Sequence, residues 1–249
     1  MKPWPASAAG AAPLGDGSGT RVMENIILSK LPVETLERLR PHFEQLSLAH
    51  GFRVIVPDEP IRHVYFPLTC LLSLVTRMED GSAVESGTIG REGMSGIPVI
   101  LKAKTTTMET LVQVPGEAIR VKAEVVREEY ERGGALHDLL NCYMHVVVVN
   151  GSQSAACNAL HRVEARFCRW LLMSSDGIGS NEVALTQEYL AVMLGVRRAT
   201  VTEVAIKIQE AGLIRYHRGQ IKILARAGVE RLACECYART RAEYERLFS

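Results

Sequence analysis

The spacing of apolar residues changes twice along the chain. Between residues 24 and 48 they recur three and four positions apart, which predicts helices that start or end near Pro32 and Pro41. The next part contains short runs rich in β-branched and aromatic residues, at 53–56, 63–66, 71–77, 83–88, 110–114 and 118–121. Turn residues separate these runs, as at 79–81 and 115–116. Many short strands with no helices between them predict an antiparallel barrel or jelly roll.

After residue 122 the helical spacing returns. Apolar residues three and four apart are Leu136, Leu139, Leu140, Tyr143, Met144 and Val147, and the helix continues toward Leu160. Such a stripe is too long for one small domain to cover, so we expect it to pack against a second copy of the chain. Packing onto the barrel alone is the alternative. A further helix is predicted at 163–174, followed by a linker at 176–181.

Residues 186–210 have the pattern of two helices joined by a tight turn. Thr186 is a predicted N-cap, and the first helix ends near Gly195, which tolerates a positive φ. A second helix is predicted from 197 to 210, with Ala191 at the close contact between the two. The residues that seal the pair are Leu190, Leu194, Val196, Val201, Val204 and Ile208.

The outward face of the second helix suits DNA. It carries Arg197, Arg198, Thr200, Thr202, Glu203 and Lys207, residue types that contact phosphates and base edges. A hairpin predicted at 213–224 adds Arg218 at its turn, and Thr186 lies at the start of the first helix. Residues 197–226 hold seven Lys or Arg against two acids, although the net charge of the whole chain is only +1. These features predict a winged helix-turn-helix that binds double-stranded DNA.

These segments resemble the Crp/Fnr family of bacterial transcription regulators. The similar motifs are LTQEYLA at 185–191, GVRRATVT at 195–202, GQIKIL at 219–224, VYFP at 64–67 and GREGM at 90–94. The resemblance covers about residues 24–240. It implies an α+β fold with an N-terminal antiparallel jelly roll of the cyclic-nucleotide-binding type, a long dimerisation helix and a C-terminal winged helix-turn-helix. It also implies a homodimer on a near-palindromic operator, with RNA polymerase as a further partner of an activator.

The resemblance places an effector pocket in the roll, and we expect Gly90, Arg91, Glu92, Gly93, Thr106 and Thr107 to line it. Members that bind cyclic AMP have an Arg-Ser pair where this chain has Lys104 to Met108, without Arg. A buried anion without a cation is costly, so the effector is unknown and cyclic AMP is not expected. The oxygen-sensing branch holds an iron–sulfur cluster on N-terminal cysteines, but here the first cysteine is Cys70.

The remaining residues indicate no cofactor, metal site or catalytic centre. Cys234 and Cys236 face different ways if both lie on a helix, and no histidine has suitable sequence spacing, so we expect no metal there. Cys142 and Cys157 lie on the dimerisation helix, either as buried thiols or as a redox link between subunits. His137, His145 and His161 are expected to be structural. Enzyme motifs such as a nucleophile elbow or a phosphate loop are absent, so we predict no enzyme.

The domain boundaries follow from these patterns. We predict a disordered tail at 1–22, with Met23 as a candidate start, a sensor roll at 23–132, a dimerisation helix at 133–162 and a DNA-binding domain at 163–249. No secretory or membrane-spanning stretch is apparent, so a cytoplasmic regulator is expected. The alternative is a ligand- or redox-sensing module whose output is mainly protein contact.

Overall fold

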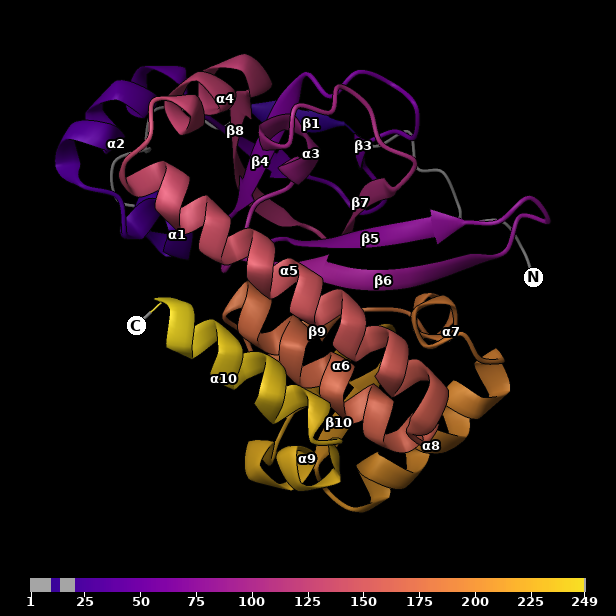
Figure 1. Ribbon diagram of the computed structural model, residues 1–249. Coiled ribbons are helices and arrows are strands. Elements are labelled where there is room, and N and C mark those ends of the chain that lie inside the picture. Colours follow the sequence, from indigo (N-terminus) through magenta and orange to yellow (C-terminus); the bar gives the residue numbers. More distant parts are fainter. Residues whose placement is uncertain (1–9, 14–20, 249) are drawn as a thin grey trace.

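The computed structural model describes residues 10–13 and 21–248. It places an antiparallel β-roll on one side and a winged helix on the other, and the long helix α5 (Ala135–Leu160) runs along both (Figure 1). Within the described residues, no helix combines the length and the apolar character needed to cross a membrane. The predicted α+β architecture, with a roll, a long helix and a C-terminal winged helix in that order, is confirmed.

Short helices lead into the roll: η1 (Arg21–Glu24), α1 (Ile26–Ser29), α2 (Val33–Leu39) and η2 (Arg40–His42). Asn25 caps α1 by accepting a hydrogen bond from the backbone N–H of Leu28 at 3.2 Å. Its side-chain amide is fully buried and donates to the carbonyls of Pro67 at 3.0 Å and Gly93 at 2.9 Å. One side chain therefore ties these helices to two separate parts of the roll.

The roll consists of two four-stranded antiparallel sheets, in the orders β1-β2-β8-β4 and β3-β7-β5-β6. The strands are β1 (Ala11–Pro13), β2 (Glu44–Leu48), β3 (Arg53–Ile55), β4 (His63–Pro67), β5 (Leu71–Arg77), β6 (Ala83–Ile89), β7 (Glu109–Val114) and β8 (Gly116–Lys122). Apolar residues of both sheets, among them Leu46, Tyr65, Leu72 and Val112, form one buried cluster. This cluster holds the two layers together because alternate side chains of each strand point to the same face.

Helices cover the other face of the first sheet. α3 (Ile97–Ile100), α4 (Ala123–Glu131) and the N-terminal half of α5 pack on Phe66 of β4 and Ile119 of β8. The C-terminal helix α10 (Cys236–Phe248) returns to this cluster and lies beside α5 (Figure 1). The hydroxyl of Tyr244 donates to the carbonyl of Glu92 at 2.7 Å, so the end of the chain is held against the roll.

The winged helix follows α5. It comprises α6 (Val163–Ile178), β9 (Glu182–Ala184), α7 (Gln187–Leu194), α8 (Arg198–Glu210), β10 (Ile214–His217), β11 (Gln220–Ile223) and α9 (Arg226–Leu232). Its three strands form a sheet in the order β10-β11-β9. Phe167, Leu190, Val201 and Ile221 are fully buried in one cluster that joins α6, α7, α8 and the wing. The fold is therefore that of a helix-turn-helix with a β wing.

The predicted strands of the roll are observed within two residues of their expected ends, but two local predictions are wrong. Residues 44–48 form strand β2 rather than the end of a helix, and burial alternates there from exposed Glu44 to buried Leu46 and Leu48. The linker expected at 176–181 is partly helical, because α6 continues to Ile178 and ends at Gly179 with a φ of 67°. β9 then follows at 182–184.

The predicted disordered tail falls mostly on residues 1–9 and 14–20, which lie outside the described residues. Its described part is ordered: β1 pairs antiparallel with β2, with Ala12 opposite Ser47, and η1 begins at Arg21. The added strand completes backbone hydrogen bonding along one edge of the first sheet.

Candidate nucleic-acid interface

The turn between α7 and α8 has the local chemistry that the sequence predicts. Thr186 is the N-cap of α7, and its hydroxyl accepts a hydrogen bond from the backbone N–H of Tyr189 at 3.4 Å. Gly195 ends α7 in the left-handed conformation, with a φ of 61° and a ψ of 36°. The N–H of Val196 then bonds to the carbonyl of Ala191 at 2.9 Å. These bonds satisfy groups left free at the two helix ends and set the path of the chain into α8.

α8 packs on α7 through one face. Val201, Ala205 and Ile208 are buried, whereas Val204, which the sequence pattern placed among the sealing residues, is only half-buried. Ala205 is buried in the same apolar cluster as Leu190 and Ala191 of α7. The hydroxyl of Thr202 donates to Oε1 of Gln187 at 3.0 Å, which adds a polar bond between the two helices.

The opposite face of α8 is open to solvent. Arg197, Arg198, Glu203 and Lys207 are exposed, and Thr200 and Thr202 are half-exposed. Arg198 lies 3.7 Å from a carboxylate oxygen of Glu188, with both side chains more than 60% exposed. An ion pair this exposed contributes little to stability, so Arg198 is free to exchange its partner for a phosphate or a guanine.

Lys207 is also paired, with its Nζ 2.9 Å from a carboxylate oxygen of Glu164 on α6. Lys207 is 69% exposed and Glu164 is 30% exposed, so this pair is less solvated than that of Arg198. Lys207 can therefore contact a phosphate in one of two ways. Either its ion pair with Glu164 breaks, or its ammonium group contacts the Glu164 carboxylate and the phosphate at the same time.

The wing places Arg218 at its tip. β10 and β11 are joined by the two-residue turn Arg218-Gly219, whose φ angles are 47° and 77°. Two positive φ angles are characteristic of the tight turns that match the twist of a hairpin. Arg215 and Lys222 lie opposite each other in the ladder and are exposed, and Lys222 pairs with Glu182 at 2.6 Å.

The helix pair is held against the second sheet of the roll. The ring of Tyr189 meets His50 edge-on, with 4.4 Å between the ring centroids. Met193 is buried between Ser73 and Gln113, which both donate to its sulfur. Val192 packs against a small apolar cluster of the same sheet. The orientation of α7 relative to the roll is thus set by direct contact between the two domains.

The predicted effector residues fall into two separate places. Arg91 and Glu92 line a cleft of about 730 Å³, between the loop after β6, the end of α6 and α10. Asp176, Arg226, Tyr237 and Arg241 form much of the rest of its polar lining. Thr106 and Thr107 are not among the lining residues and lie in the loop before β7, where Thr107 is exposed. Of the six residues expected to form an effector pocket, this cleft therefore brings together Arg91 and Glu92.

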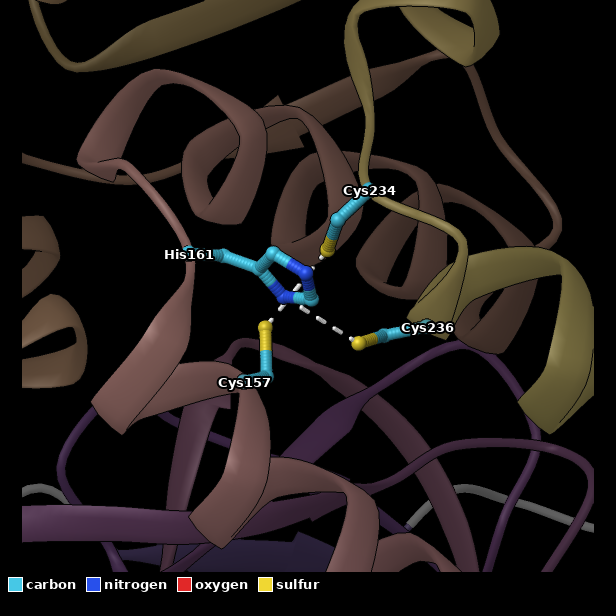
Figure 2. A group of neighbouring side chains, drawn as sticks. All are labelled: Cys157, His161, Cys234 and Cys236. Atoms are coloured by element: carbon cyan, nitrogen blue, oxygen red, sulfur yellow. Dashed lines mark hydrogen bonds between the residues drawn. The ribbon is translucent and has the colours of Figure 1, made fainter.

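The predicted roles of the cysteines and histidines also change. Cys157 is fully buried and its sulfur lies 3.5 Å from that of Cys234, so it does not face a second subunit. Cys142 is half-buried. His137 contacts Asn141 and Tyr130, and His145 pairs with Glu243, as structural residues do. His161, however, joins Cys157, Cys234 and Cys236 in one cluster, which the sequence spacing did not reveal (Figure 2).

The comparisons with known proteins agree with this geometry. Residues 165–232 match the family model described as the Crp-like helix-turn-helix domain. The search of curated proteins found no match. The match spans α6 to α9, which is the segment that contains both helices and the wing.

Solved structures resemble about three quarters of the chain or more. A putative Crp/Fnr-family transcriptional regulator from Eubacterium rectale is 16% identical, with a TM-score of 0.62, over 83% of this chain and 96% of that one. FixK2 from Bradyrhizobium japonicum is 14% identical, with a TM-score of 0.64, over 77% and 98%. A CRP-family regulator from Thermus thermophilus is 18% identical, with a TM-score of 0.61, over 75% and 95%. The chain therefore has the fold of Crp/Fnr transcription regulators, with a Crp-like helix-turn-helix domain.

Proposed function

We propose that this protein is a cytoplasmic transcription regulator of the Crp/Fnr type that binds a near-palindromic operator as a homodimer. The observation that carries the proposal is the exposed basic face at the start of α8, formed by Arg197 and Arg198, together with the exposed Arg218 at the tip of the wing. An arginine at the start of a recognition helix can bond O6 and N7 of guanine, while the wing reaches the backbone.

In this proposal three parts of the chain have separate tasks. Residues 23–132 form the sensor, residues 133–162 form the dimerisation helix and residues 163–249 form the DNA-binding domain. The last part includes α10, which packs back on α5. Thr186 and Lys207 contact phosphates, and Thr200, Thr202 and Glu203 face base edges. The protein acts as a regulator and not as an enzyme.

Dimerisation is supported by the outer side of α5. Exposed residues along this side are Val148, Gly151, Ser152, Ala155 and Ala159. They are small or apolar and recur at helical spacing, so a second helix can approach closely. A dimer through α5 would present two copies of α8 to successive major grooves, about 34 Å apart.

The proposal also includes a site for the effector. The cleft lined by Arg91 and Glu92 is the candidate pocket, since it touches the roll, α6 and α10 together. A ligand bound in this cleft would touch both the sensor and the DNA-binding domain, and would therefore change how the two domains pack together. Arginines and carboxylates are mixed in its lining, so the cleft does not offer the unopposed cation that a cyclic phosphate needs.

The test is a DNA-binding titration of the reduced full chain against its own upstream region, at several salt concentrations. Arg198→Ala should weaken selective binding by about 1–3 kcal/mol, or roughly 5- to 140-fold. Lys104→Ala is the matched control, because Lys104 is an exposed cation on the roll. Equal operator affinity of Arg198→Ala and the wild type would refute the assignment of Arg198. Selective binding that requires added cyclic AMP would refute the expectation about the effector.

A further inference from the structure

Four side chains that are far apart in the sequence meet between the long helix and the C-terminal helix. Cys157 and His161 stand one helical turn apart at the end of α5, and Cys234 and Cys236 lie in the link between α9 and α10 and at the first turn of α10. Figure 2 shows all four side chains pointing into one space. Their sulfur and ring-nitrogen atoms all lie within 4.8 Å of one another, and the three cysteines are buried.

The distances suit a tetrahedral metal ion. Cys157 Sγ lies 3.5 Å from Cys234 Sγ, and Cys236 Sγ lies 3.4 Å from Nδ1 of His161. Around a tetrahedral Zn²⁺ with Zn–S bonds of about 2.3 Å, two sulfurs stand about 3.8 Å apart. A disulfide would need about 2.05 Å, which no pair here approaches. Three cysteines and one histidine are also a donor set typical of structural zinc.

Polar side chains next to the cluster orient His161 and Cys236 as metal ligands commonly are. Nε2 of His161 lies 3.3 Å from a carboxylate oxygen of Glu235, while Nδ1 faces Cys236. A metal-bound histidine commonly donates its second ring N–H to a carboxylate, which sets the tautomer and the ring orientation. The side-chain amide of Gln153 donates to Cys236 Sγ at 3.0 Å, a bond that stabilises a thiolate.

Two arginines on α6 supply the charge that such a site needs. Three thiolates and one Zn²⁺ leave a net charge of about −1, which is costly to bury alone. Arg166 and Arg169 lie close enough to Cys157 to interact with it electrostatically: burial raises the pKa of the Cys157 thiol and lowers that of the Arg166 guanidinium, and the attraction between thiolate and guanidinium opposes both shifts. The Nε atoms of both arginines are buried without a hydrogen-bond partner in the described part of the chain. Anionic ligands beside them would balance this positive charge.

We infer that Cys157, His161, Cys234 and Cys236 bind one Zn²⁺ per chain in a closed Cys₃His site. On binding, the three thiols release their protons to solvent and the ion takes their electron pairs and that of Nδ1, with no change of oxidation state. All four positions are protein ligands, so the site is structural rather than catalytic. It clamps the junction of α5 and α6 to the start of α10, and thereby fixes the winged helix on the dimerisation helix.

The first experiment measures metal in the full chain, purified under reducing conditions without chelator. Elemental analysis should find about one zinc per chain. Reconstitution with Co²⁺ should give the intense visible bands of tetrahedral thiolate coordination, and Zn²⁺ should displace them. Both measurements use the wild-type chain, so they do not depend on whether a variant folds.

Variants then assign the ligands. Cys234→Ser with Cys236→Ser should lower the zinc content to below a tenth of the wild-type value and abolish the cobalt bands. Cys142→Ser is the matched control, because Cys142 also lies on α5 but is not in the cluster, and it should retain the metal. His161→Cys should keep a metal with a shifted cobalt spectrum, which a merely structural histidine would not do.

Three results would overturn the inference. Wild-type protein that contains no zinc and gives no tetrahedral cobalt spectrum refutes the site. Iron with acid-labile sulfide would show that the same residues hold a cluster and not zinc. A mass lower by two hydrogens in native protein, with Cys157 linked to Cys234 after digestion, would show a disulfide instead.

Discussion

The indole N–H of Trp170 donates to Oε1 of Glu85 at 3.1 Å, and this bond joins α6 of the DNA-binding domain to β6 of the roll. The other carboxylate oxygen of Glu85 accepts from the hydroxyl of Ser73. Glu85 and Trp170 are both less than 10% exposed. The Glu85 carboxyl group is therefore one of the contacts between the two domains, and its protonation state affects how strongly they are held together.

The stability of the protein should fall as pH rises through the titration range of Glu85. Burial raises the pKa of Glu85 from 4.5 to about 7, although its hydrogen bonds and Arg169 oppose the shift. Between these two values the folded protein binds more protons than the unfolded chain, so stability is greatest at the low end and is lost as pH rises. Glu85→Gln removes the titration and should abolish roughly 1–3 kcal/mol of this pH dependence.

Urea unfolding at a series of pH values from 5 to 8 measures this effect. Glu59→Gln is the control, since Glu59 is exposed in the loop after β3. An unchanged pH slope in Glu85→Gln would show that another group is responsible.

A side chain at Gly90 should separate the roll from α6. A Cβ atom there would lie 2.3 Å from the Cα of Gly177 and 2.6 Å from its carbonyl oxygen, and both are backbone atoms. The Arg91 N–H bonds to that same carbonyl at 2.8 Å. Gly90→Ala should therefore destabilise the protein by about 1–3 kcal/mol. Gly87→Ala, in the same chain segment, meets only Leu74 at 3.8 Å and should be nearly neutral in thermal unfolding.

A charge on the outer face of α5 should prevent dimerisation. Val148 is 67% exposed in the single chain, so Val148→Glu costs little in the protomer but buries a carboxylate in the proposed helix–helix contact. Sedimentation should show a dimer for the wild type and a monomer for this variant. Val33→Glu, at a site that is 66% exposed on α2, should stay dimeric. A dimeric Val148→Glu would place the interface elsewhere.

The wing tip should contribute affinity without sequence preference. Arg218→Ala removes an exposed cation from the turn between β10 and β11. Each lost phosphate contact lowers the slope of log K against log salt by about 0.9, on operator and on unrelated DNA alike. Fluorescence anisotropy at several salt concentrations measures both slopes. A loss confined to the operator would mean that Arg218 reads bases.

The helix-turn-helix was predictable because its signals are local. The Thr186 cap, the left-handed Gly195 and the apolar spacing within each helix all act over a short stretch of chain, so they appear directly in the sequence. The strands of the roll were predictable for the same reason, because the alternation of apolar and polar residues that indicates a strand is also a local signal. At residues 44–48 the alternation was short and adjoined a helical pattern, and only pairing with β1 and β8 makes it a strand.

Contacts between distant residues were decided by the tertiary structure alone. The sequence shows Cys157 and His161 four apart and Cys234 two before Cys236, but 72 residues lie between the two pairs, and only the return of α10 to α5 brings them together. The tertiary structure alone also places Trp170 next to Glu85, and it leaves Thr106 outside the cleft that Arg91 lines. Local sequence thus determined the elements and their faces, whereas the packing of whole elements, whose energy is summed over many residues, decided which chemical groups meet.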